Sequence, residues 1–210
     1  MLERELGAEE VYPNDADLAE LPHGWYPTTT EIVERSAAID RRVVIGHYPA
    51  SLAGALSGEP RQVVTVLREP VARTVSMLLH RRRTLGSHEP LEALLDDERF
   101  VEAQLRDYQT KVLGMGLGEV NLPFPTDDRT FVDARDALHS MHCVGVAERF
   151  GAFCAAFDAR YGTRLAAEVR RDNAAPGAGA HIPRRLRNRI LPLVERDLEL
   201  HRLAVAAAAR

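Results

Sequence analysis

The chain has 210 residues, of which 45% are hydrophobic and 28% are charged, enough for one well-packed domain and short for two. Its formal charge of -4 at pH 7 creates no overall attraction to nucleic acid or to an anionic membrane, so neither is an expected partner. No apolar run approaches the roughly 20 residues that a membrane helix needs, and the first residues show no signal-peptide pattern. We therefore expect a cytoplasmic protein with no transmembrane segment.

Short strand patterns alternate with helical ones, which is typical of an α/β protein. We expect strands at Glu10–Tyr12, Arg42–Gly46, Val63–Leu67 and Cys143–Val146, and helices at Thr30–Ala38, Val71–Arg83, Glu98–Tyr108, Phe131–Ser140, Arg149–Tyr161 and Arg184–Ala207. A Gly- and Pro-rich loop over Ala174–Pro183 precedes the last helix. The expected fold is a three-layer arrangement, one parallel sheet flanked by helices, in a single domain over residues 1–210.

The segment from residue 61 to residue 83 carries the clearest functional signal. A β-branched run ends at Arg68, and Pro70 then stands where the first turn of a helix tolerates a residue without an N–H. Arg68 at the end of the strand and Ser76 on the helix can point to one place. Together with the positive N-terminus of that helix they would form an anion site, and phosphate is the usual anion. The alternative is structural: an arginine paired with a carboxylate, and a serine bonded to its own helix.

Four stretches carry a resemblance to a known family. Leu-Arg-Glu-Pro-Val-x-Arg-x-x-Ser, starting at Leu67, resembles the LRDPxxRxxS element with which sulfotransferases that use 3′-phosphoadenosine 5′-phosphosulfate (PAPS) hold the 3′-phosphate. The heparan sulfate O-sulfotransferases and their bacterial relatives are the most similar. Three further stretches follow that family's order, at residues 45–49, 108–114 and 144–150. The resemblance implies a P-loop nucleoside triphosphate hydrolase-like fold of the sulfotransferase type, with Arg68 and Ser76 as nucleotide-binding residues.

His47 follows a strand-like run and so lies at the carboxyl end of a strand, where open α/β sheets place their ligands. In the resembling enzymes a histidine at this Gly-His position is the general base. The structural alternative is a histidine that closes the strand end through hydrogen bonds. Gln109 and Thr110 belong to a stretch that lines the nucleotide or acceptor cleft in that family, but an ordinary helix end explains them equally well, and we assign them no catalytic role.

No metal site is expected. His139, His142 and Cys143 form an HxxHC pattern that matches no standard zinc spacing, and a helix running into a buried strand explains it better. Neither of the two cysteines, Cys143 and Cys154, belongs to a C-x-x-C pair, so we expect buried thiols in a reducing compartment.

The sequence departs from the family at its beginning. The resembling enzymes start with a strand and a Lys-containing, Gly-rich loop that cradles the 5′-phosphosulfate, whereas residues 1–7 resemble the end of the helix that follows this loop. The chain has one lysine, Lys111, which lies in another motif. Two explanations remain: an N-terminally truncated gene model, which we favour, or a natural short form. A missing strand would leave an open sheet edge and favour homo-oligomers.

The function that follows is transfer of a sulfuryl group from PAPS to a hydroxyl-bearing acceptor, such as a glycan, a lipid or a small molecule. His47 would be the base, Arg68 and Ser76 would bind the co-substrate, and the product would be 3′-phosphoadenosine 5′-phosphate (PAP). The alternative is a non-catalytic nucleotide- or partner-binding protein that keeps only the 3′-phosphate half-site. A P-loop kinase would need a Walker lysine, which the sequence lacks.

Overall fold

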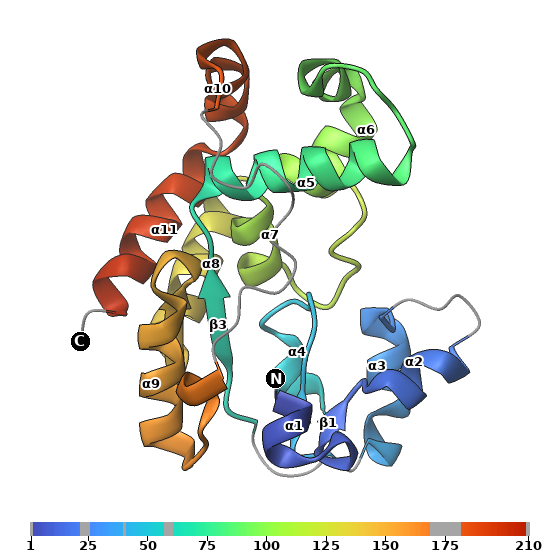
Figure 1. Ribbon diagram of the computed structural model, residues 1–210, viewed down its shortest axis with the longest axis vertical. Helices are drawn as coiled ribbons and strands as arrows, with labels where there is room; N and C mark the ends of the chain where they lie inside the picture. Colours follow the sequence, from blue (N-terminus) through green and yellow to red (C-terminus); the bar gives the residue numbers. More distant parts are fainter. Residues whose placement is uncertain (1, 22–25, 40, 57–60, 169–181, 209–210) are drawn as a thin grey trace.

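The computed structural model describes residues 2–21, 26–39, 41–56, 61–168 and 182–208, and it is mostly helical with two small parallel sheets (Figure 1). One sheet pairs β1 (Val11–Tyr12) with β2 (Val43–Val44), and the other pairs β3 (Val64–Leu67) with β4 (Cys143–Val146). The strands lie where the sequence predicts them, and the protein is α/β. The single sheet is not found, because the four described strands form two separate pairs.

The β1–β2 sheet carries the first helices of the chain. These are α1 (Leu2–Leu6), α2 (Asp15–Glu20), α3 (Thr29–Arg35) and α4 (Leu52–Ala55). Asn14 and Thr28 begin α2 and α3 with capping boxes, in which each side chain accepts a backbone N–H of the first turn. The helices close over a small core of their own, formed by Tyr12, Ile32, Ile39 and Leu52.

The β3–β4 sheet is covered by longer helices. They are α5 (Pro70–Thr84), α7 (Tyr108–Gly114), α8 (Asp128–Ser140), α9 (Phe150–Tyr161) and α11 (Glu195–Ala207), and in Figure 1 α9 and α11 lie to one side of β3. Leu67 and Val146 at the ends of the two strands pack against Leu138 of α8 and Leu200 of α11. No helix in the described part of the chain is long and apolar enough to cross a membrane.

Two helices predicted as continuous are divided. The segment Glu98–Tyr108 consists of α6 (Glu98–Phe100), a π-helix η4 (Val101–Leu105) and the start of α7. The last segment divides into α10 (Arg184–Ile190), the 3₁₀ turn η7 (Leu191–Leu193) and α11, because Pro192 has no N–H to continue the helical ladder. Residues 174–181 of the predicted loop lie outside the described residues. The other 3₁₀ turns are η1 (Ala8–Glu10), η2 (Ser36–Ala38), η3 (Leu91–Asp96), η5 (Ala147–Arg149) and η6 (Leu165–Glu168).

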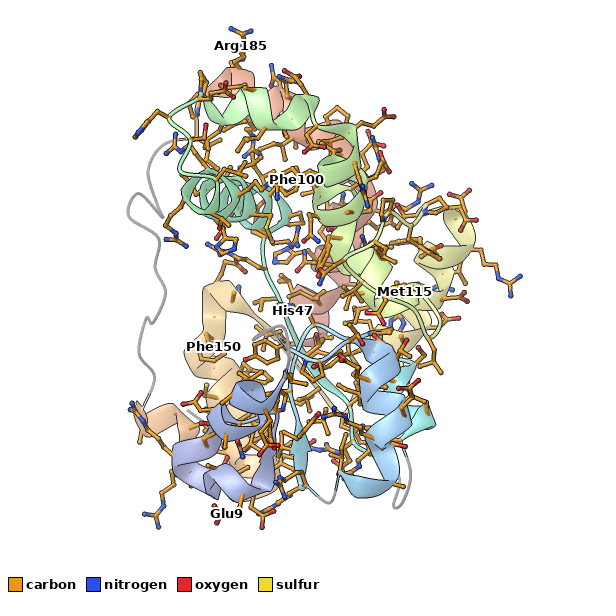
Figure 2. All side chains as sticks on the ribbon, turned by 90° about the vertical axis from the view of Figure 1, so that its right-hand side faces the viewer. Glu9, His47, Phe100, Met115, Phe150 and Arg185 are labelled. Atoms are coloured by element: carbon orange, nitrogen blue, oxygen red, sulfur yellow. The ribbon has the colours of Figure 1, made fainter. Side chains whose placement is uncertain are left out.

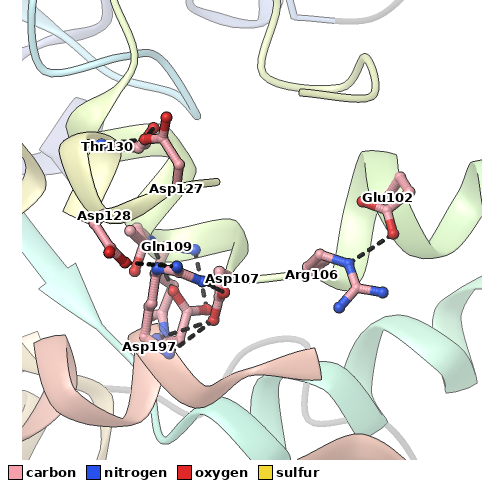
Figure 3. A network of polar contacts seen from close by, with 10 residues as sticks. Glu102, Arg106, Asp107, Gln109, Asp127, Asp128, Thr130 and Asp197 are labelled. Atoms are coloured by element: carbon pink, nitrogen blue, oxygen red, sulfur yellow. Dashed lines mark hydrogen bonds and ion pairs between the residues drawn. The ribbon is translucent and has the colours of Figure 1, made fainter. Parts of the chain in front are cut away.

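Two buried carboxylates join α7 to α11 (Figure 3). Asp197 accepts the N–H groups of Gln109 and Thr110 at 3.1 and 2.7 Å, while Asp107 accepts those of Arg196 and Asp197 at 3.0 and 3.2 Å. Asp197 in the first turn of α11 therefore caps the first turn of α7, and Asp107, the residue before α7, caps the first turn of α11. Burial raises the pKa of Asp197 to about 6, against the lowering effect of those N–H groups. This exchange fixes the start of α7, which borders the candidate site.

Candidate functional site

A large cavity of about 1920 Å³ lies between the two sheets. His47, Arg68 and Ser76 all line it, so the predicted base and the two predicted phosphate ligands border one space. They reach it from three elements: the segment after β2, the end of β3 and α5. Figure 2 shows His47 near the middle of the molecule, between the part that holds Phe100 and the part that holds Glu9.

The junction of β3 and α5 positions Arg68. The strand ends at Leu67 and the helix begins at Pro70, as the sequence predicts within one residue. Glu69 is the N-cap, and its Oε2 accepts the N–H of Ala72 at 2.7 Å. This carboxylate already occupies the helix N-terminus that we expected to contribute to the anion site. The guanidinium of Arg68 and the hydroxyl of Ser76 remain available, because neither has a hydrogen-bond or ion-pair partner among the described residues.

Gln109 holds the backbone of Arg68 from the opposite side. The N–H of Arg68 donates to Oε1 of Gln109 at 2.8 Å, and Nε2 of Gln109 donates to the carbonyl of Arg68 at 2.9 Å. A strand residue normally makes such a pair of bonds with a neighbouring strand. Here one side chain from α7 makes both. The family-like stretch around Gln109 thus has a positioning role that the sequence did not reveal.

One face of α5 brings further basic residues to the cavity beside Ser76. Arg73, Ser76, His80 and Arg83 all line the cavity, at steps of three, four and three residues, while Val71 and Leu78 on the other side are 0% exposed. From the sequence, Arg73 and Arg83 were expected on other faces of this helix than Ser76, with Arg83 at most attracting an anionic nucleotide from a solvated face. The periodic spacing around Ser76 was the signal in the sequence that identifies them.

Arg73 is held rigidly at the wall of the cavity. Its guanidinium lies 3.8 Å from the centre of the Tyr108 ring, and its Nη1 donates to the carbonyl of Gln104 at 2.6 Å. Because a guanidinium keeps its charge in proteins, Arg73 is a permanent positive charge beside the site. Its charge acts on His47 across the cavity wall.

His47 lies three residues beyond β2 on a segment that is attached at both ends. Ile45 extends the β1–β2 pairing by donating its N–H to the carbonyl of Tyr12 at 2.9 Å, and Ala50 donates to the carbonyl of Val112 at 3.2 Å. A Cβ on Gly46 would lie 2.2 Å from Cε2 of Tyr48, so this close approach requires glycine. His47 is exposed toward the cavity, yet the surrounding walls desolvate it. This desolvation, followed by the charge of Arg73, lowers the pKa of His47 below its usual value, so its neutral, basic form predominates at pH 7.

The only lysine does not reach the cavity. Lys111 is 0% exposed, and its ammonium donates to the carbonyl oxygens of Glu102, Ala103 and Leu122. Burial, followed by the charge of Arg73, lowers its pKa to about 8. Lys111 therefore connects the π-helix to α7 and the segment after it, and the basic residues that line the cavity are arginines and histidines.

Thr110 and the HxxHC pattern make contacts that maintain the fold. Thr110 is 0% exposed, and its N–H is one of the two that Asp197 accepts. His142 accepts the N–H of Val63 at its Nδ1, at 3.2 Å, and Cys143 is the first residue of β4. The HxxHC pattern thus spans the end of α8 and the start of β4. Comparisons with protein families, with curated proteins and with solved structures found no match for this chain.

Proposed function

We propose that this protein binds the 3′-phosphate of PAPS and transfers the sulfuryl group to a hydroxyl-bearing acceptor. The observation that carries the proposal is the shared cavity: His47, Arg68 and Ser76, chosen from two separate motifs, line one space. Arg73, His80 and Arg83 add positive or ionisable groups to the same wall. A doubly charged phosphate binds best where several such donors converge.

The chemistry assigns one role to each group. Arg68 and Ser76 donate to the 3′-phosphate and orient the nucleotide, with the sulfuryl group toward His47. The acceptor oxygen attacks sulfur as the bond between sulfur and the bridging phosphate oxygen breaks, and PAP leaves with the electron pair. His47 takes the proton of the acceptor hydroxyl, which its lowered pKa allows because the ring is neutral at pH 7.

A calorimetric titration of PAP into the 210-residue chain tests the nucleotide site. Loss of a charge-assisted hydrogen bond is expected to weaken binding about 10- to 100-fold in Arg68→Ala, and less in Ser76→Ala. Arg99→Ala is the matched control, since Arg99 is an exposed residue of α6 outside the cavity. Equal affinity in Arg68→Ala and Arg99→Ala would refute the assignment, as would a wild-type chain that does not bind PAP.

A second function, nucleotide binding without turnover, is favoured by the position of Lys111. Its ammonium is bonded to three carbonyl groups and cannot stabilise charge on a transferring sulfuryl group. PAP release from PAPS in the presence of a panel of hydroxyl acceptors separates the two functions. Tight binding of PAP with no release above the uncatalysed rate, for every acceptor class, would favour the binding protein.

A further inference from the structure

The lining of the cavity is basic, although the chain as a whole has a formal charge of -4. Its described residues include six arginines: Arg41, Arg42, Arg61, Arg68, Arg73 and Arg83. Against these six guanidinium groups the same lining contains one carboxylate, that of Glu10. A cleft lined mainly by charges of one sign concentrates ligands of the opposite sign. The cavity therefore favours anionic molecules along its whole length.

The arginines form two groups at opposite ends of the strands. Arg42 immediately precedes β2 and Arg61 lies three residues before β3, so both lie at the amino ends of the strands. Arg68 follows β3 at its carboxyl end, where α5 adds Arg73 and Arg83. In Figure 1 the arrow of β3 points toward α5, away from the amino end. At the rise of a strand, the seven steps from Arg61 to Arg68 amount to about 23 Å.

Arg42 and Arg61, which we call the amino-end pair, retain free donors. Nη1 of Arg61 donates to the carbonyl oxygen of Arg41 at 2.6 Å, a contact that joins the amino ends of the two sheets. Nε of Arg61 is buried and has no hydrogen-bond partner among the described residues. The exposed guanidinium of Arg42 takes part in no hydrogen bond or ion pair within the same ranges. Because buried polar groups are normally hydrogen-bonded, the free Nε indicates a site for an acceptor.

An uncharged strip connects the two groups of arginines. It consists of residues 43–45 and 63–67, all of which line the cavity. Thr65 has the one polar side chain in this strip, and the other members are Val, Ile and Leu. A charge placed at this level would be desolvated without a partner. The lining thus fits a molecule with an apolar body and an anionic group at its end.

The nucleotide accounts for one group of arginines only. The 3′-phosphate and the 5′-phosphosulfate of PAPS are attached to the same ribose. Both anionic groups therefore lie near the carboxyl ends of the strands when Arg68 and Ser76 hold the 3′-phosphate. The amino-end pair is left for a second molecule, and the acceptor is the molecule that must share the cavity with PAPS.

We propose that Arg42 and Arg61 bind the carboxylate of the acceptor, and that the acceptor is a long-chain hydroxy acid whose hydroxyl lies at His47. The identity of the ligand as acceptor rests on the proposed function, whereas the carboxylate site does not. Five residues separate Arg42 from His47, a span of at most about 16–18 Å. Bonds of about 1.5 Å with angles of about 111° advance an extended hydrocarbon chain by about 1.25 Å each. A chain of about 12 carbons covers the distance.

Calorimetric titration of 12-hydroxydodecanoate into the nucleotide-free chain tests the amino-end pair. The matched ligand without a charge is 1,12-dodecanediol. We expect the acid to bind at least fivefold more tightly than the diol, because its carboxylate accepts charge-assisted hydrogen bonds. Arg42→Gln and Arg61→Gln should each weaken binding of the acid at least fivefold and leave binding of the diol within twofold, which shows that the cavity is intact. Arg99→Gln, outside the cavity, should change neither affinity.

Two further titrations determine which end holds the carboxylate. Affinity for the acid should stay within twofold in Arg68→Gln and in the presence of saturating PAP. A loss in either titration would place the carboxylate at the carboxyl ends of the strands and overturn the proposal. Equal affinities for acid and diol would also overturn it, as would unchanged binding of the acid in both Arg42→Gln and Arg61→Gln.

Release of PAP from PAPS tests the role of the acid as acceptor. We expect release with 12-hydroxydodecanoate at a lower KM than with the diol. Release with the diol but not with the acid would overturn the acceptor assignment. A chain that binds the acid through the amino-end pair but does not bind PAP would refute the proposed function and leave the carboxylate site in place, so the two proposals can fail separately.

Discussion

The side chain of Gln109 is bonded to both backbone groups of Arg68, at 2.8 and 2.9 Å. Gln109 itself is held at the start of α7, where its N–H donates to the buried carboxylate of Asp197 (Figure 3). A chain of contacts thus runs from α11 through α7 to the end of β3. It fixes the backbone of the residue that we propose as the phosphate ligand.

Replacing Gln109 with leucine should destabilise the protein and weaken nucleotide binding. The backbone N–H and C=O of Arg68 would lose their partners in a partly buried site, which we expect to lower the free energy of unfolding by about 1–3 kcal/mol. Chemical denaturation and PAP titration measure the two effects. Gln104→Leu is the control, because within the described part of the chain its side chain makes one exposed hydrogen bond, to Asn121. Unchanged stability and unchanged PAP affinity in Gln109→Leu would contradict a positioning role.

Measurements of turnover and PAP affinity should distinguish the general base from the phosphate ligands. In His47→Ala we expect turnover to fall about 10²- to 10⁴-fold with PAP affinity within about twofold of the wild type, since a general base acts on the acceptor proton. In Arg68→Ala both turnover and affinity should fall. His139→Ala, an exposed histidine of α8, is the control. Equal loss of turnover and PAP affinity in His47→Ala would refute the role assigned to His47.

The lowered pKa of His47 predicts how activity depends on pH. Because desolvation and the charge of Arg73 disfavour the protonated ring, the base should already be active below pH 6.5, and turnover should fall only under more acidic conditions. Arg73→Gln should move the midpoint upward by removing the positive charge, whereas Arg99→Gln should not. An NMR titration of the His47 ring gives the midpoint directly. A midpoint above the usual value of about 6.5 would contradict this prediction.

Asp197 should make stability depend on pH in the opposite direction from a carboxylate whose pKa is lowered by folding. Its pKa rises from 3.8 in the unfolded chain to about 6 in the folded state, so the folded state binds more protons between these values. The contribution is fully present below pH 3.8 and is lost as the pH rises through 6. Wild type should therefore lose on the order of 1–3 kcal/mol relative to Asp197→Asn between about pH 4 and about pH 7. A constant difference, or a gain by wild type, in urea unfolding would show that this carboxylate is not desolvated.

Gly114 permits the close contact between α7 and α8. A Cβ at this position would lie 2.0 Å from the carbonyl oxygen of Thr130, a backbone atom that cannot rotate away. Gly114→Ala should thus cost about 1–3 kcal/mol of stability through forced separation of the two helices. Gly116→Ala is the control, since a Cβ there meets nothing within 4 Å. Equal melting temperatures of the two variants would show that the helices move apart without cost.

Sequence signals from residues close together in the chain made part of the site predictable. The run of β-branched residues, the N-capping Glu69 and Pro70 at the first helical position define the strand-to-helix junction through contacts within a few residues. The position of His47 just beyond a strand follows from the same kind of local signal. Arg73 and Arg83 were predictable in principle from their helical spacing to Ser76, but the spacing alone does not say which face meets the cavity.

By itself, the sequence determined the four strands and the β3–α5 junction, because these depend on propensities and contacts between near neighbours; it singled out His47, Arg68 and Ser76 through motif resemblance, and their roles remain proposals. Only the tertiary structure decided that Gln109 holds Arg68, that Lys111 is buried away from the cavity, and that the described strands form two pairs with a cavity between them. Such pairings join residues tens of positions apart. Periodicity records which face of an element is apolar, but it does not record which partner that face or edge will meet.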